Sequence, residues 1–116
     1  MIASVSVPGI GWNRQENLAK MLSHMDAAAS QNADLLLFPE TVLTGLINTG
    51  DTTNDMGLGI TIDSNEILSL SLKAAETGLW VAFGFFELEN NVLFDSAMLL
   101  DSCGGIALHY RRISTG

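Results

Sequence analysis

One glutamate stands just beyond a sharp break in the sequence. In DLLLFPETVLTG, residues 34–45, four consecutive large apolar residues run into Pro39, and Glu40 follows at once. Proline cannot donate to a sheet ladder and biases its predecessor toward an extended backbone, so a strand over Leu35–Phe38 would present Glu40 at its carboxyl end. Open α/β sheets bind ligands at that edge.

The apolar wall before Glu40 also bears on its chemistry. Partial desolvation disfavours the charged form of a carboxylate, which suits it to act as a general base near neutral pH. A second interpretation remains open on these grounds, in which Glu40 caps a turn or faces water. The residues alone therefore make Glu40 a candidate base and no more.

The elements that must position this residue follow from hydrophobic periodicity and turn signals. A run without alternation, such as 35–38, predicts a parallel strand covered on both faces, whereas Thr44–Asp63 has no sustained period and predicts a long loop. The last three strands are joined at Asn90-Asn91 and around Ser102–Gly105, both short enough for hairpins. The predicted strands are Ile2–Val7, Leu35–Phe38, Leu79–Leu88, Val92–Leu100 and Ile106–Arg111. The first predicted helix is capped by Asn13 and ends near Ser30, and the second is capped by Asp63 or Ser64 and ends at Gly78. The predicted fold is α/β, with the order βαβαβββ and a mixed sheet.

Composition limits the possible functions. The 116 residues are 47% hydrophobic and 16% charged, which fits one folded domain and argues against a disordered chain. A net charge of −8 argues against nucleic acid or an anionic membrane as a partner. No apolar run approaches the ~20 residues of a membrane span, and no basic residue precedes the first apolar stretch. With Cys103 as its single cysteine, we expect a cytoplasmic chain without an intrachain disulfide.

The segment DLLLFPETVLTG resembles the glutamate segment of the nitrilase superfamily of carbon–nitrogen hydrolases, in which an apolar strand runs into Phe-Pro-Glu. The first 34 residues are similar to the family's opening strand and helix, and VAFGFFELENNVLFDSAMLLDSCGGIALHYRR, residues 81–112, resembles its three following strands. The resemblance covers nearly the whole chain. It implies the amino-terminal part of an αββα sandwich.

The resemblance also implies a reaction. Enzymes of this family resemble one another in using a Glu, a Lys and a Cys. The cysteine attacks the substrate carbon to form a thioester, the glutamate transfers protons, and the lysine stabilises the tetrahedral intermediates. Glu40 matches the glutamate, and the lysine position falls on Arg112. Period-two alternation places Arg112 with Leu108 and Tyr110, and Arg111 on the other side. Arg112 is a permanent cation with a planar guanidinium, so it could stabilise an oxyanion. It could instead pair with an acid at a strand end. No metal or organic cofactor is implied.

Two further departures from the family pattern concern the nucleophile and position 95. Cys103 lies at a Gly-Gly turn, and nothing nearby in the sequence would activate its thiol, so we interpret it as structural. The family's cysteine belongs on a later strand, beyond Gly116. Asp95 stands where an asparagine before Ser-Ala is common. Residues 1–116 are therefore expected to be an incomplete domain that is inactive alone.

Two functional hypotheses follow. The first is the amino-terminal part of a hydrolase that acts on a small amide, nitrile or carbamoyl substrate, with Glu40 and Arg112 in the site. The alternative is a nitrilase-like module without catalysis, retained for oligomerisation or binding. Half of a sandwich would expose a wide apolar face, so we expect a homo-oligomer or association with a missing carboxy-terminal half.

Overall fold

The computed structural model describes residues 2–5, 14–39, 42–43 and 59–113. Within them the predicted order βαβαβββ is confirmed. The strands are β1 (Ala3–Val5), β2 (Leu35–Leu37), β3 (Trp80–Glu89), β4 (Val92–Leu100) and β5 (Ile106–Ile113), and the helices are α1 (Arg14–Ser30) and α3 (Asn65–Thr77).

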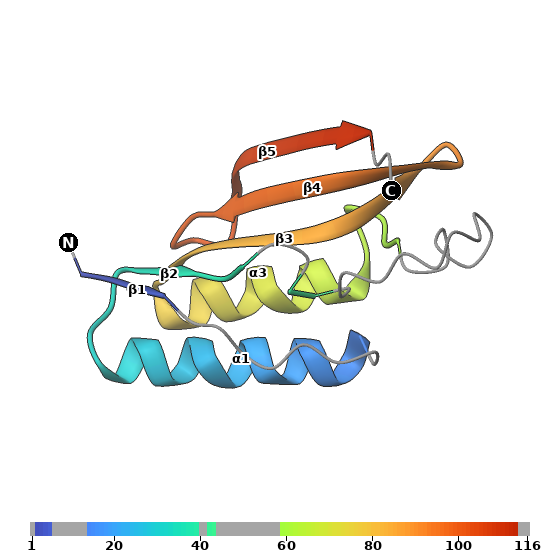
Figure 1. Cartoon of the computed structure of the whole chain (residues 1–116). Helices are drawn as coiled ribbons and strands as arrows, with labels where there is room; N and C mark the ends of the chain where they lie inside the picture. Colours follow the sequence, from blue (N-terminus) through green and yellow to red (C-terminus); the bar gives the residue numbers. More distant parts are fainter. Residues whose placement is uncertain (1, 6–13, 40–41, 44–58, 114–116) are drawn as a thin grey trace.

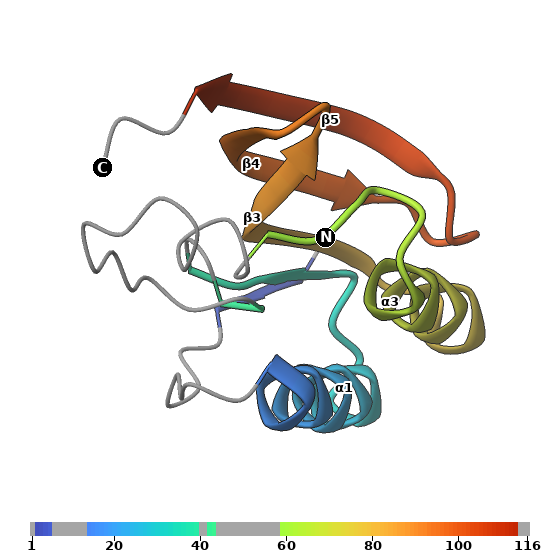
Figure 2. The same ribbon diagram turned by 90° about the vertical axis from the view of Figure 1, so that its right-hand side faces the viewer.

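One mixed sheet contains all five described strands, in the order β1-β2-β3-β4-β5. β1, β2 and β3 are parallel, and β4 and β5 continue the sheet as an antiparallel meander. Both helices lie on the same side of this sheet, side by side beneath it (Figures 1 and 2). The described chain is thus two layers, with α1 and α3 forming one and the sheet the other.

The signals at the ends of α3 act as predicted. Ser64, rather than Asp63, is the N-cap, and its hydroxyl accepts a hydrogen bond from the Ile67 N–H at 3.3 Å. At the other end Gly78 takes the left-handed conformation (φ 72°) and donates to the Ala74 carbonyl at 2.8 Å. The cap of α1 predicted at Asn13 lies outside the described residues.

Both predicted hairpins are present. Asn90 and Asn91 have φ values of 51° and 63°, as a two-residue turn between twisted antiparallel strands requires. In the second turn the Asp101 carboxylate accepts hydrogen bonds from the N–H groups of Cys103 and Gly105, both at 2.9 Å. Gly104 there has φ 87°.

Several predicted boundaries needed correction. β1 is described only over Ala3–Val5, because residues 6 and 7 lie outside the described part. β2 ends at Leu37, one residue early, since Pro39 follows Phe38 and cannot extend the ladder. β3 is shifted by one residue, and β5 reaches Ile113 and so includes Arg112. Most of the predicted loop, residues 44–58, is outside the described residues.

The hydrophobic core lies between the helices and the sheet. Its members are buried side chains from both layers and from residues 42, 43 and 60: Met21, Met25, Ala28, Leu36, Phe38, Val42, Leu43, Ile60, Ile67, Leu70, Ala74, Leu79, Val81, Phe83, Phe85, Met98 and Leu100. They follow period-two alternation on β3 and β4 and a helical period on α1 and α3. This layer contact accounts for the burial of the helix-facing side of the sheet.

No described element covers the opposite side of the sheet, which we call the open face. Its side chains include Val5, Leu35, Leu37, Trp80, Ala82, Leu99, Leu108 and Tyr110. Val5, Leu108 and Tyr110 are 69%, 66% and 67% exposed. The prediction that strand 35–38 is covered on both faces is therefore wrong for this chain: Leu36 is buried, but Leu35 and Leu37 are only half-buried.

A membrane span would need a long apolar helix. Neither α1 nor α3 is long and apolar enough, and no other helix occurs in the described part of the chain.

Candidate functional site

Glu40, the predicted base, lies outside the described residues, but the chain on either side of it is described. The Phe38 N–H donates to the Ala82 carbonyl at 2.9 Å, which extends the contact between β2 and β3 by one residue. On the far side, the buried Asn17 side chain of α1 donates from Nδ2 to the Leu43 carbonyl at 3.2 Å. The described residues before Glu40 therefore contact the sheet, and those after it contact α1.

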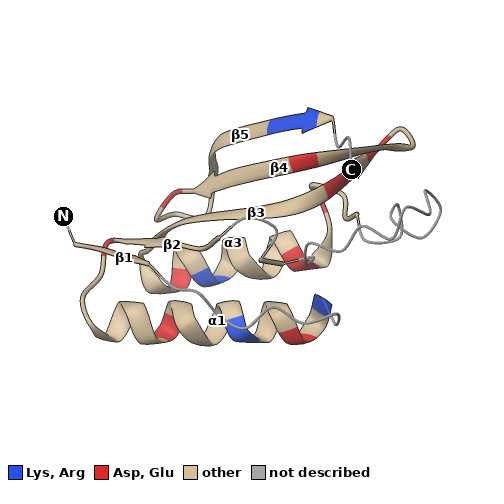
Figure 3. Ribbon diagram, in the orientation of Figure 1, with Lys and Arg blue, Asp and Glu red and all other residues tan. Residues whose placement is uncertain are grey.

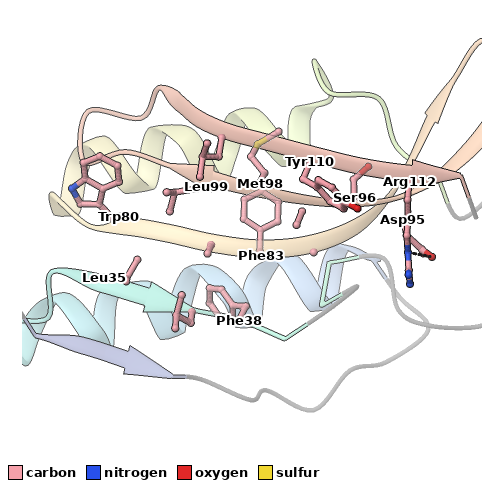
Figure 4. A pocket seen from close by; sticks show the side chains of 15 residues that line it. Leu35, Phe38, Trp80, Phe83, Asp95, Ser96, Met98, Leu99, Tyr110 and Arg112 are labelled. Carbon is pink, nitrogen blue, oxygen red and sulfur yellow. Dashed lines mark ion pairs between the residues drawn. The ribbon is translucent and has the colours of Figure 1, made fainter.

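Arg112 is on the open face, as the alternation predicted. It shares that side of β5 with Leu108 and Tyr110, and the three side chains line one shallow depression over β2–β5 (Figure 4). The floor is mainly apolar and includes Leu35, Leu37, Trp80 and Leu99, whereas Asp95 and Arg112 supply its charges. Phe38, two residues before Glu40, also lines this depression.

The carboxyl ends of β2 and β5 point toward the same edge of the sheet. The register joins Leu37 to Ala82, Ala82 to Leu99, and Leu99 to Leu108, so these residues form one row across four strands. Because β2 and β5 run in the same direction, the chain leaves both strands on the same side of that row. The described residues that directly follow β2, Phe38 and Pro39, and the end of β5 that contains Arg112 thus share one edge, where open α/β sheets bind ligands.

Arg112 has a partner directly across the strand pair. It registers with Asp95 of β4, and its Nε lies 3.6 Å from Asp95 Oδ2. The Arg112 side chain is 68% exposed and that of Asp95 is 29% exposed. The pairing of Arg112 with an acid, left open as an alternative by the sequence, therefore exists, across the strands within the meander.

The helix-facing side of the same strands carries a polar cluster that sequence reasoning missed. Glu87 is 1% exposed, and its carboxylate accepts a hydrogen bond from Ser96 Oγ at 2.8 Å. His109 Nε2 lies 2.6 Å from Glu87 Oε1, and Arg111 Nη1 lies 3.3 Å from Glu87 Oε2. An available signal was the position of Glu87, whose parity in β3 places it with Val81, Phe83 and Phe85 on the buried side.

Arg111 completes this cluster from the edge strand. It also pairs with Glu89, and its guanidinium lies 4.6 Å from the centre of the Phe94 ring. The hydrogen bond that Arg111 donates to the Glu89 carboxylate raises the pKa of Arg111 above its ordinary value, so Arg111 is held as a cation. Figure 3 shows this concentration of positive charge at the end of β5, beside acidic positions on β3 and β4. The cluster fastens β5 to the sheet, and of its members Ser96 alone also lines the depression.

Cys103 is separated from the candidate site. It is exposed in the turn before β5, whereas Arg112 stands near the opposite end of that strand. Six residue steps from Ile106 to Arg112 correspond to roughly 20 Å of extended strand. The interpretation of Cys103 as structural is consistent with this placement, since a nucleophile must reach the same substrate carbon on which the cation and the base act. Among the described residues, no three His, Cys, Asp or Glu side chains gather as metal ligands would.

Comparison with known families and proteins gives a consistent match along the chain. The family model described as carbon–nitrogen hydrolase matches residues 1–115. An arylacetonitrilase of Hypocrea virens is 33% identical over 107 residues, which cover 85% of this chain and 32% of that protein. A citrullinase of Francisella tularensis is 31% identical over 101 residues, covering 86% of this chain and 35% of that protein.

Solved structures agree on the fold. The C. elegans NitFhit protein superposes with a TM-score of 0.81 at 13% identity, covering 97% of this chain and 27% of that one. An amidase from Nesterenkonia sp. superposes with a TM-score of 0.76 at 19% identity, covering 96% of this chain and 41% of that one. The chain thus spans about a third of the length of the curated relatives that it matches.

Proposed function

Because this chain belongs to the carbon–nitrogen hydrolase family, we propose that it is the amino-terminal part of an enzyme that hydrolyses a non-peptide carbon–nitrogen bond. The resemblance to the nitrilase superfamily drawn from the sequence is confirmed by the family match over residues 1–115. That match carries the proposal, because it covers the Phe-Pro-Glu segment and all five strands together. An amide, a nitrile or a carbamoyl compound is the proposed substrate, and the names of similar proteins include an arylacetonitrilase, a citrullinase and an amidase.

The proposed chemistry uses two residues of this chain. Glu40 takes a proton from the attacking thiol and gives it to the leaving nitrogen, then takes a proton from water and returns it to the released sulfur. Arg112 stands at the lysine position and stabilises the negative charge of the tetrahedral intermediates. The nucleophile is a cysteine outside residues 1–116, whose sulfur forms a thioester as the nitrogen leaves and is released again when water attacks.

The exposure of apolar side chains on the open face also supports this proposal. Apolar side chains with exposures near two thirds are costly to leave in water, and a second layer of strands over Leu108 and Tyr110 would bury them. We assign that layer to the carboxy-terminal part of the hydrolase domain, and place the assembled enzyme in the cytoplasm.

The experiment is an ammonia-release assay on the protein expressed from its natural reading frame, with an amide, an arylacetonitrile and citrulline as substrates. Hydrolysis of at least one is expected, and Glu40→Gln should lower kcat by about 100-fold or more. Glu76→Gln, which changes an exposed glutamate on α3, is the matched control and should leave the rate unchanged.

Two results would overturn parts of this proposal. Full activity in Glu40→Gln would remove Glu40 as the base. An acyl adduct found by mass spectrometry on Cys103 would show that the nucleophile is within this chain. The expected adduct is on another cysteine of the expressed protein.

A non-catalytic nitrilase-like module is the second candidate function. Arginine in place of lysine favours it, because Arg112 cannot release a proton and is partly neutralised by Asp95. This candidate predicts no ammonia release from any substrate and oligomerisation through the open face. The ammonia-release assay distinguishes the two functions, and sedimentation velocity on the same preparation tests the oligomerisation.

A further inference from the structure

The contact between Arg112 and Asp95 uses one particular nitrogen. The carboxylate oxygen Oδ2 lies 3.6 Å from Nε, the nitrogen that joins the guanidinium to its aliphatic chain. We propose that Asp95 is a positioning residue for Arg112: it holds the Nε edge and leaves the two terminal nitrogens to donate to the developing oxyanion of the substrate. This inference rests on the hydrolase function proposed above.

An arginine at this position needs orientation in a way that a lysine does not. An ammonium carries three donors that rotate about one bond, so it can follow an oxygen from many directions. A guanidinium donates only in its own plane, and a tilt of that plane turns its hydrogens away. Since the Arg112 side chain is 68% exposed, packing alone does not fix the plane.

Asp95 is placed to supply that orientation. It belongs to β4, an interior strand paired on both sides, whereas Arg112 belongs to the edge strand β5. The Asp95 side chain is also the less exposed of the two, at 29%. The two residues are in direct register and on the same face, so the short acidic side chain is the fixed member of the pair (Figure 4).

The other nearby acids are committed to the opposite face. Glu87 and Glu89 both contact Arg111, on the helix-facing side of the sheet. Among the described residues, Asp95 is therefore the acid that pairs with Arg112. This division gives each of the two consecutive arginines its own carboxylate partner.

Position and charge can be separated by the choice of substitution. Asp95→Asn keeps an oxygen in the place of Oδ2, 3.6 Å from Nε, but removes the negative charge, and Asp95→Ala removes both. If Asp95 acts by holding the plane of the guanidinium, asparagine should substitute for it and alanine should not. If Asp95 acts by its charge, the two variants should behave alike.

The experiment uses the protein expressed from its natural reading frame, with Asp95→Asn, Asp95→Ala and the control Glu89→Gln. Two quantities are measured: kcat and KM for the best substrate of the ammonia-release assay, and the NMR signal of the Arg112 Nε–H. We expect Asp95→Ala to lower kcat by about 10- to 100-fold, since small misplacements of a catalytic group have costs of this order. Its KM should change little, because the oxyanion exists only after substrate has bound.

The expected pattern across the set is specific. Asp95→Asn should recover most of the lost kcat and keep the Nε–H signal near its wild-type shift, whereas Asp95→Ala should move it. Glu89→Gln should change neither quantity. Unchanged kcat and an unchanged Nε–H signal in Asp95→Ala would overturn the proposal, and so would equal losses in the alanine and asparagine variants.

The NMR signal also separates this proposal from the proposed function. If the wild-type protein hydrolyses none of the substrates, the hydrolase function fails and the catalytic part of the role of Asp95 fails with it. The Nε–H signal then tests only whether Asp95 positions the Arg112 guanidinium. A changed chemical shift in Asp95→Ala that returns to the wild-type value in Asp95→Asn supports this positioning, and an unchanged chemical shift overturns it.

Discussion

Arg111 and Arg112 are consecutive in the sequence and pair with carboxylates on opposite faces of the sheet. Arg111 contacts the buried Glu87 on the helix-facing side, and Arg112 contacts Asp95 on the open face. The alternation of a β-strand enforces this separation. One arginine thereby fastens the edge strand to the sheet, and the other is presented at the candidate site.

The first prediction concerns the buried member of the Arg111 cluster. Glu87→Gln keeps the size of the side chain but removes the charge that His109 and Arg111 contact, and it replaces one acceptor oxygen with a donor. We expect a loss of about 1–3 kcal/mol in the free energy of unfolding, measured by urea titration of the 116-residue chain.

Glu89→Gln is the control for this measurement. It removes the other carboxylate that contacts Arg111, but the Glu89 side chain is 47% exposed, so water competes for the contact. The expected loss is below about 1 kcal/mol. Equal losses in the two variants would contradict the view that burial of Glu87 is what makes its contacts matter.

The second prediction concerns the turn between β4 and β5. Gly104 has φ 87°, and a Cβ at this position would stand 2.5 Å from the Ser71 carbonyl oxygen of α3. Gly104→Ala should therefore combine backbone strain with a clash against helix backbone, and we expect it to destabilise the fold by about 2–4 kcal/mol. Thermal and urea unfolding would measure this loss.

Gly78→Ala offers a matched comparison. Gly78 has a similar φ of 72°, but an added Cβ would meet nothing within 4 Å. Only the left-handed backbone is then penalised, at about 1–2 kcal/mol. A loss at Gly78 as large as that at Gly104 would show that contact with Ser71 adds nothing.

Much of the fold was predictable because its signals are local. Ser64 and Gly78 mark the ends of α3, and Asn90-Asn91 marks a hairpin, since each residue satisfies a backbone requirement at its own position. The placement of Arg112 on the open face was also predictable, because alternation along one strand depends on nothing outside it.

The partners of these residues were not predictable in the same way. That Asp95 faces Arg112 depends on the register of β4 against β5, which is fixed by a five-residue turn and a register shift between Leu99 and Leu100. The contact of Asn17 with Leu43 depends on how α1 packs against the chain after β2. Such tertiary pairings have no signature within a short window of sequence.

The third prediction is a pH dependence that joins the two helices. Lys73 Nζ on α3 donates a hydrogen bond to Asp26 Oδ1 on α1 at 3.2 Å, and this bond raises the pKa of Lys73 above its ordinary 10.5. A raised pKa means that the folded state binds the proton more tightly, so this contribution is fully present below pH 10.5 and is lost as the pH rises through the folded-state pKa.

Lys73→Met isolates that contribution. Urea midpoints measured from pH 9 to pH 12 should fall more steeply for the wild-type chain than for Lys73→Met, since the variant has no ammonium to titrate. Asp26→Asn should reduce the steepness in the same direction, because it removes the largest cause of the raised pKa. Parallel curves for all three proteins would contradict a role for this contact in stability.

The fourth prediction tests whether the open face is a packing surface. Leu108 is 66% exposed there, so Leu108→Glu should change the stability of the 116-residue chain by less than about 1 kcal/mol, while lowering its self-association. Leu68→Glu, at a leucine 54% exposed on the helix layer, is the control and should leave association unchanged. Sedimentation velocity over a range of concentrations would measure both. In the protein expressed from its natural reading frame, Leu108→Glu should instead destabilise by about 2–4 kcal/mol, because the proposed carboxy-terminal layer would bury the charge between two sheets. If Leu68→Glu and not Leu108→Glu dispersed the chain, the helix layer rather than the open face would be the surface of association.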